Sequence, residues 1–125
     1  MRRALWMLSL SGLLLGVAPQ LPLRAGSLGD AVEPSTQAQI KLARDLKQAG
    51  AIFYGAWWCT HCFHQKNLFG TEGGRELPYI ECASDEAGKE RCLEAGVRAF
   101  PTWMLGEQRK EGVMTLEELR AWAGL

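Results

Sequence analysis

Two cysteines separated by two residues stand in the segment WWCTHC, residues 57–62. A C-x-x-C pair can form a reversible disulfide, and it can also supply two of the four ligands that a zinc site needs. His61 lies between the two cysteines, and His64 follows them closely. The segment therefore indicates either disulfide exchange or metal binding, and the rest of the sequence has to separate the two.

The distribution of the four cysteines favours disulfide exchange. Structural zinc sites usually combine two paired motifs, but only Cys59 and Cys62 form a C-x-x-C pair. Cys82 and Cys92 lie far apart, and an even number of cysteines is typical of disulfides in an exported chain. A Cys59–Cys62 disulfide with a purely structural role would close a loop too short to restrict the unfolded chain much. We therefore predict a redox pair and expect neither a metal nor a cofactor.

A strand and a helix are expected on either side of this pair. The apolar run 51–55 is typical of a buried strand, and residues 59–69 have helical spacing. Cys59 would then stand at a helix N-terminus, where free backbone N–H groups stabilise a thiolate. His61 is expected to donate to or pair with that thiolate, which makes His61 a catalytic candidate beside the cysteines. His64 is expected on the helix flank, in a solvated or packing role.

The rest of the chain predicts alternating helices and strands. The first two strands, joined through a helix, should be parallel, and the last two should form a hairpin. A cap at Ser35 or Thr36 and a capping box at Thr115 to Glu118 mark the starts of the first and last helices. The expected elements are helices over 35–50, 59–69, 84–96 and 115–125 and strands over 51–55, 77–82, 103–105 and 108–114, with a loop over 70–74.

Cys82 and Cys92 are interpreted mainly as a structural disulfide. Cys82 ends an expected strand and Cys92 lies in the following helix. A bridge between them would stabilise the fold by about 2.5–3 kcal/mol in the chain-entropy model. The alternative is a second redox pair that passes electrons to or from Cys59–Cys62.

The N-terminus predicts export. Arg2 and Arg3 precede a charge-free run from residue 4 to residue 23, which fits a signal peptide. The run of about 20 residues is also long enough for a retained membrane anchor. In both cases the following residues cross the membrane, into a space where disulfides persist. We divide the chain into a signal or anchor over 1–25, a linker over 26–35 and one domain over 36–125.

The charge of the exported part gives no sign of a nucleic-acid partner. Three of the 14 Lys and Arg residues precede residue 26, whereas all 14 Asp and Glu residues follow it. The exported part is therefore slightly acidic, and nucleic-acid-binding domains are typically basic.

Three features together resemble the thioredoxin superfamily. They are the apolar strand Ile52–Gly55, Trp58 directly before the C-x-x-C, and the later sequence Phe100-Pro101-Thr102. The resemblance implies an α/β fold with a mixed central sheet of about four strands flanked by helices. It also implies a cis peptide bond before Pro101, and a backbone pairing between Phe100 and bound substrate. Trp57, Trp58, Phe100 and Pro101 would form an apolar rim for docking.

A narrower resemblance covers nearly the whole exported part. The segments FYGAWWCTHCFHQKNLFG, YIECASDEAGKERC and GVRAFPTWML are similar to the thioredoxin-like domain associated with vitamin K epoxide reductase homologues of cyanobacteria and plant plastids. This similarity implies cysteine-containing exported proteins as substrates and a separate quinone-linked membrane protein as partner. It also implies a periplasmic or thylakoid-lumen location, soluble or anchored.

Two departures from typical thioredoxins predict the direction of electron flow. Phe53 stands where typical thioredoxins carry a buried acid, and Thr60-His61 is closer to the x-His pair of disulfide oxidases and isomerases. We therefore expect a thiol–disulfide oxidoreductase that works mainly as an oxidant. The alternatives are a lumenal or periplasmic thiol reductant, and a non-enzymatic metal-binding module that uses Cys59, Cys62 and His61.

Overall fold

A mixed four-stranded sheet forms the centre of the protein, and the predicted α/β fold class is confirmed. The computed structural model describes residues 29–125, so the predicted signal or anchor over 1–25 lies outside the described part. The elements in chain order are α1 (Gln37–Gln48), β1 (Ile52–Gly55), α2 (Thr60–Asn67), α3 (Gly70–Glu76), β2 (Tyr79–Glu81), α4 (Glu86–Glu94), β3 (Thr102–Leu105), β4 (Gln108–Glu111) and α5 (Leu116–Ala123).

The strand order places the redox segment at the centre of the sheet. The order is β2-β1-β3-β4, with β1 and β2 parallel and the other neighbours antiparallel. The parallel first pair and the final hairpin were both predicted and are both confirmed. Because β1 is an interior strand, the cysteine segment that follows it is held by neighbours on both sides.

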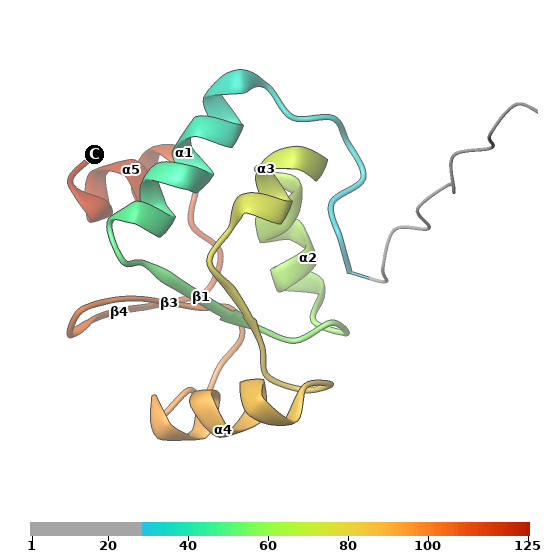
Figure 1. Cartoon of the computed structure of the whole chain (residues 1–125), viewed down its shortest axis with the longest axis vertical. Helices are drawn as coiled ribbons and strands as arrows, with labels where there is room; N and C mark the ends of the chain where they lie inside the picture. The colour runs from blue at the N-terminus through green and yellow to red at the C-terminus, as the bar shows by residue number, and fades with distance from the viewer. Residues whose placement is uncertain (1–28) are drawn as a thin grey trace, which may run out of the picture.

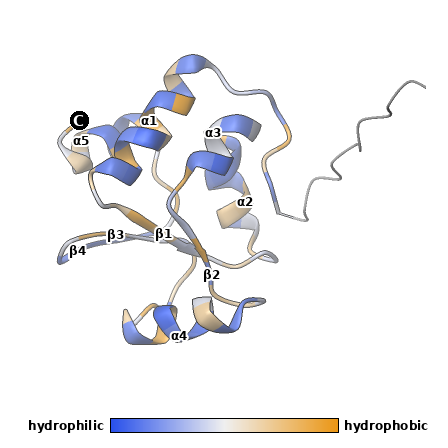
Figure 2. Ribbon diagram, in the orientation of Figure 1, coloured by the Kyte–Doolittle hydropathy of each residue, from blue (hydrophilic) through white to orange (hydrophobic). Residues whose placement is uncertain are grey.

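Helices cover both faces of the sheet unequally (Figure 1). Among the helices of residues 29–125, α4 lies alone on one face, and α1, α2, α3 and α5 lie on the opposite face. The larger core fills the space under these four helices, where Phe53 and Trp103 are fully buried and stack at 4.8 Å between ring centroids. A smaller core of Tyr54, Ile80 and the two later cysteines lies toward α4. Hydrophobic residues accordingly gather on β1 in the middle of the sheet, whereas the edge strand β4 is hydrophilic (Figure 2).

Two predicted helix starts are confirmed by their hydrogen bonds. Thr36 caps α1 and Thr115 caps α5, each with a complete capping box whose other half is Gln39 or Glu118. The first and last helices therefore begin where local sequence places them.

The prediction of a loop over residues 70–74 is wrong, because α3 occupies this region. Three glycines made a helix unfavourable by propensity. Distant contacts overcome this: Ser35 Oγ accepts a 2.8 Å hydrogen bond from Gly73 N and donates a 2.6 Å bond to Phe69 O. A Cβ at Gly73 would lie 3.4 Å from the backbone of Gln39 in α1. Glycine therefore allows α3 to pack closely on α1.

The last strand is shorter than predicted. β4 ends at Glu111, whereas the predicted strand extended to Met114. Gly112 turns the chain with a positive φ of 96°. Met114 then pairs with a side chain of α2 instead of continuing the sheet.

Residues 29–36, here called the N-terminal strap, run along α2 and α3. Val32 N donates to Asn67 Oδ1 at 3.0 Å, and Thr71 N donates to Glu33 O at 2.7 Å. The predicted linker overlaps this segment, and the division of the chain into domains stays a prediction. Within residues 29–125, no helix combines the length and the apolar character that crossing a bilayer requires.

Candidate active site

Cys59 lies at the junction where β1 leads into α2, as predicted. It is the N-cap residue of α2, and its Sγ accepts a 3.1 Å hydrogen bond from Cys62 N. Its own N–H donates to Ala56 O at 3.0 Å, which closes the turn between strand and helix. Both cysteines carry free thiols. The first sulfur therefore receives a backbone N–H at a helix N-terminus, the arrangement that stabilises a thiolate.

The second cysteine has a different environment. Both cysteines are buried, but Cys62 is 1% exposed whereas Cys59 is 7% exposed. Burial, followed by its hydrogen bond with Cys59, raises the pKa of the Cys62 thiol to about 12. Cys62 therefore stays protonated at neutral pH, and its proton must leave before it can attack a mixed disulfide.

Two open grooves meet at Cys59 and Trp58. One, of about 400 Å³, is lined by Gly29, Trp57, Trp58, Cys59, Thr60 and Phe63. The other, of about 460 Å³, is lined by Trp58, Cys59, Thr60, His61, Arg98, Ala99 and Phe100. The Trp57 and Trp58 side chains are 43% and 58% exposed, which is high for tryptophan. An extended chain has room to lie on either side of the first cysteine.

The structure gathers most of the predicted site residues around these grooves. Trp58 and Phe100 meet edge to face with their ring centroids 5.9 Å apart. The Phe100–Pro101 peptide bond is cis, and Pro101 itself is buried. His61 is exposed and lines the second groove, and residues 29–125 show no hydrogen bond between His61 and Cys59. His64 is exposed and lines neither groove.

Tyr79 was missed by the sequence analysis, although it lies close to the buried thiol. A Cβ built on Gly55 would lie 2.8 Å from Tyr79 Cε2 and 3.0 Å from Cys62 Sγ. The ring and the thiol thus both border the bare backbone of Gly55. Phe53, which occupies the position of the family's buried acid, packs edge to face on the same ring.

Tyr79 shares a hydrogen bond with Glu81, a second residue that the sequence analysis missed. Tyr79 OH donates to Glu81 Oε2 at 2.7 Å, and Ala83 N donates to Glu81 Oε1 at 2.8 Å. Burial by itself would raise the pKa of Glu81, but these hydrogen bonds and others from backbone N–H groups lower it. Burial, followed by the bond to Glu81, raises the pKa of Tyr79. Glu81 therefore stays ionised and Tyr79 stays protonated at neutral pH.

Lys66 and Gln65 are two buried polar residues of α2 that the sequence analysis did not assign to the site. Lys66 Nζ lies 3.8 Å from the centroid of the Tyr79 ring and 3.7 Å from Asp30 Oδ1 in the N-terminal strap. Gln65 Oε1 accepts from Trp103 Nε1 at 3.2 Å and from Met114 N at 2.9 Å. The sequence contained one signal for this placement: Gln65 and Lys66 follow Cys62 by three and four residues, and residues at these spacings share a face of a helix.

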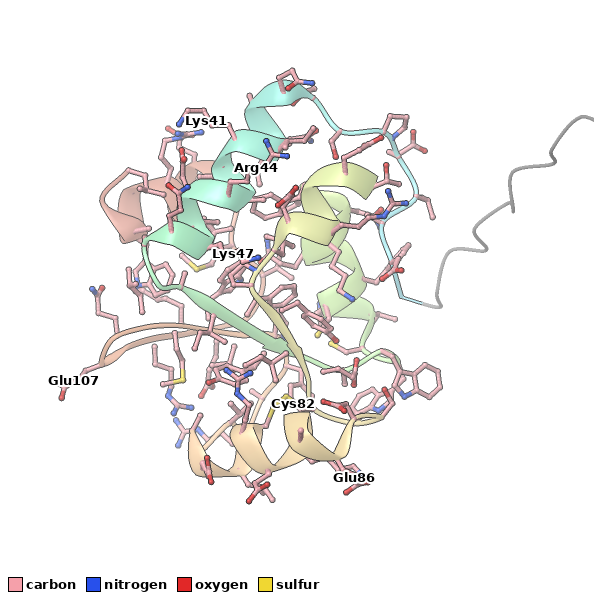
Figure 3. All side chains as sticks on the ribbon, in the orientation of Figure 1. Lys41, Arg44, Lys47, Cys82, Glu86 and Glu107 are labelled. Atoms are coloured by element: carbon pink, nitrogen blue, oxygen red, sulfur yellow. A yellow bond between two sulfur atoms is a disulfide. The ribbon has the colours of Figure 1, made fainter. Side chains whose placement is uncertain are left out.

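Cys82 and Cys92 form a disulfide on the opposite face of the sheet. Their Cα atoms are 5.8 Å apart, within the usual range for this bond. Cys82 points from the sheet toward α4 (Figure 3). Within residues 29–125, His, Cys, Asp and Glu side chains form no group of three or more that is suited to a metal.

Comparison with known proteins points to the same chemistry. No family model matches the chain. The chain is similar to "Thiol-disulfide oxidoreductase LTO1" of Arabidopsis thaliana, with 35% identity over 118 residues. The match covers 86% of this chain but 31% of LTO1. This chain thus spans less than a third of the length of that relative.

Proposed function

Because this chain belongs to the thioredoxin superfamily, we propose that it is a thiol–disulfide oxidoreductase that exchanges its Cys59–Cys62 disulfide with cysteine-containing exported proteins. The observation that carries the proposal is the asymmetry of the pair. Cys59 Sγ receives a backbone N–H at the start of α2 and borders two open grooves, while Cys62 is buried behind it. Disulfide exchange requires one sulfur that a substrate thiol can reach and a second sulfur directly behind it.

The reaction proceeds in two exchange steps. A substrate thiolate attacks Cys59 Sγ of the oxidised pair, which forms a substrate–Cys59 disulfide and breaks the Cys59–Cys62 bond. The leaving Cys62 thiolate takes up one proton. A second substrate thiolate then attacks the substrate sulfur of the mixed disulfide, and Cys59 leaves as a thiolate. Two electrons pass from the substrate to the pair, and the substrate gains a disulfide.

The oxidant direction is supported by the surroundings of Cys62. Phe53 stands where a buried carboxylate would otherwise accept the Cys62 proton, so the return attack by Cys62 on a mixed disulfide lacks that base. The dithiol would be reoxidised by a quinone-linked membrane protein related to vitamin K epoxide reductase, which accepts two electrons and two protons. The location would be the periplasm or the thylakoid lumen, either free or held by residues 4–23.

A redox titration of the full-length chain against glutathione tests both the activity and its direction. A midpoint potential of about −120 mV supports an oxidant, and a midpoint potential of about −270 mV supports the alternative, a reductant. Cys59→Ser should abolish exchange with a dithiol peptide. Cys62→Ser cannot form the internal disulfide. Its Cys59 thiolate should instead attack an oxidised peptide, break the peptide disulfide and accumulate a Cys59–peptide mixed disulfide, because no internal thiol can resolve it.

The matched control is Ser84→Ala, an exposed position outside both grooves, which should behave like the wild type. The proposal fails if the wild-type protein does not exchange disulfides with the peptide. Cross-linked membrane partners recovered with the Cys62→Ser variant would identify the protein that reoxidises the pair.

A further inference from the structure

Lys66 is a buried cation on the same face of α2 as Cys62. It lies one helical turn after Cys62, and its side chain is 10% exposed. A charged residue is rarely buried unless it is paired, because desolvation of the charge is costly. Two partners offset that cost here, the Tyr79 ring at 3.8 Å and the Asp30 carboxylate at 3.7 Å.

The Tyr79 ring connects Lys66 with the thiol pair. The ring carries the ammonium group on its face, and its Cε2 atom and Cys62 Sγ both lie next to the bare Cα of Gly55, within 3.0 Å of where a Cβ would stand. Because this region is buried, charges act on one another more strongly than they would in water. Lys66 therefore faces the reduced pair across one aromatic ring.

We propose that Lys66 is a positioning residue that stabilises the Cys59 thiolate which exchange leaves beside the protonated Cys62 thiol, and thereby makes the Cys59–Cys62 disulfide a stronger oxidant. This inference rests on the proposed exchange function. A cation lowers the free energy of the thiolate but has little effect on the uncharged disulfide, so it favours the reduced form. The equilibrium with substrate thiols then moves toward oxidised substrate.

Charged groups from three other segments also face this region. Asp30 lies in the N-terminal strap and is half-exposed, so it offsets part of the Lys66 charge. Glu81 on β2 is bound to Tyr79 OH, and Arg75 on α3 lines the same cavity as Lys66 and Asp30. On α2 itself, burial dominates the raised pKa of Cys62, and Lys66 acts against it. If charge is the cause, removal of the Lys66 charge and removal of the Asp30 charge should shift the equilibrium constant with glutathione in opposite directions.

The test is the equilibrium constant of the full-length protein with glutathione, measured for matched variants at pH 7. Lys66→Met should reduce the tendency of the pair to accept electrons by about tenfold, equivalent to about 30 mV. Lys66→Arg keeps the charge and should stay within about twofold of the wild type. Asp30→Asn should shift the constant in the opposite direction to Lys66→Met. Lys41→Met, which removes an exposed cation of α1, should change nothing.

The outcomes separate this inference from the proposed function. If the wild type does not equilibrate with glutathione, the exchange function itself fails. If the wild type equilibrates but Lys66→Met matches it, only the role of Lys66 is refuted. Equal shifts for Lys66→Met and Lys66→Arg would assign the effect to packing and would also overturn the inference. Should Lys66→Met fail to fold, as judged by circular dichroism, the sign of the Asp30→Asn shift decides.

Discussion

The two thiols of the active site differ in their surroundings. Cys59 is the N-cap residue of α2, whereas Cys62 lies within α2 on its buried side. Cys59 lines both grooves and its sulfur receives the Cys62 N–H, whereas Cys62 lies deeper in the core, near Tyr79. Gly55 makes the second arrangement possible, since a side chain at this position would collide with both Tyr79 and Cys62. The chemistry of the pair thus depends on a residue that has no functional group.

The raised pKa of Cys62 makes the stability of the reduced protein depend on pH. The pKa of a free cysteine is about 8.5, whereas the pKa of Cys62 in the folded protein is raised to about 12. Between these values the unfolded state binds fewer protons than the native state, so stability falls as pH rises. We expect the free energy of unfolding of the reduced protein to decrease from pH 8 to pH 10.

Urea denaturation at several pH values, with a reductant present, measures this dependence. The reduced Cys62→Ala variant is the control, because it retains Cys59 and lacks the buried thiol. Its stability should decrease less over the same range. Parallel curves for the two proteins would show that Cys62 titrates normally.

α3 and α4 show how glycines set the distance between elements. Gly73 allows α3 to approach α1, and Gly88 allows α4 to approach β2, where an added Cβ would overlap Glu81 O. A rigid backbone oxygen cannot move aside as a flexible side chain can. Gly74, in contrast, has room for a methyl group, with Ala31 Cβ at an ordinary 3.6 Å.

Alanine at Gly88 and alanine at Gly74 should therefore change the free energy of unfolding in opposite directions. Gly88→Ala forces α4 away from the sheet and should lower the free energy of unfolding by about 1–3 kcal/mol. Gly74→Ala removes an entropic cost in α3 and should raise it by up to about 1 kcal/mol. Chemical denaturation of both variants beside the wild type checks the signs. A neutral Gly88→Ala would contradict the close contact between α4 and Glu81.

Across the whole molecule, the two cysteine pairs belong to separate cores on opposite faces of the sheet. Cys59 and Cys62 lie in the larger core, and Cys82 and Cys92 lie in the smaller one beneath α4. The second pair fixes α4 to the sheet, as Figure 1 and the disulfide together indicate. This separation favours a structural role for the second disulfide.

Removal of the second disulfide should affect stability more than exchange activity. The Cys82→Ala/Cys92→Ala double variant should lose about 2.5–3 kcal/mol of stability under oxidising conditions. Its Cys59–Cys62 equilibrium with glutathione should stay unchanged. Thermal unfolding and the redox titration measure the two effects independently. Loss of exchange with the membrane partner, in a variant that is still folded, would instead support a relay between the pairs.

The sequence alone determined the features that depend on neighbouring residues: the cysteine pair at a strand–helix junction, the helix caps at Thr36 and Thr115, the parallel first pair of strands and the final hairpin. Only the tertiary structure decided that residues 70–76 form a helix and that Lys66 is buried beside the active site. The physical reason is that these features depend on contacts between distant segments, Ser35 with Gly73 and Lys66 with Tyr79. Local propensity contains no information about such partners, and for α3 it favoured the wrong conformation.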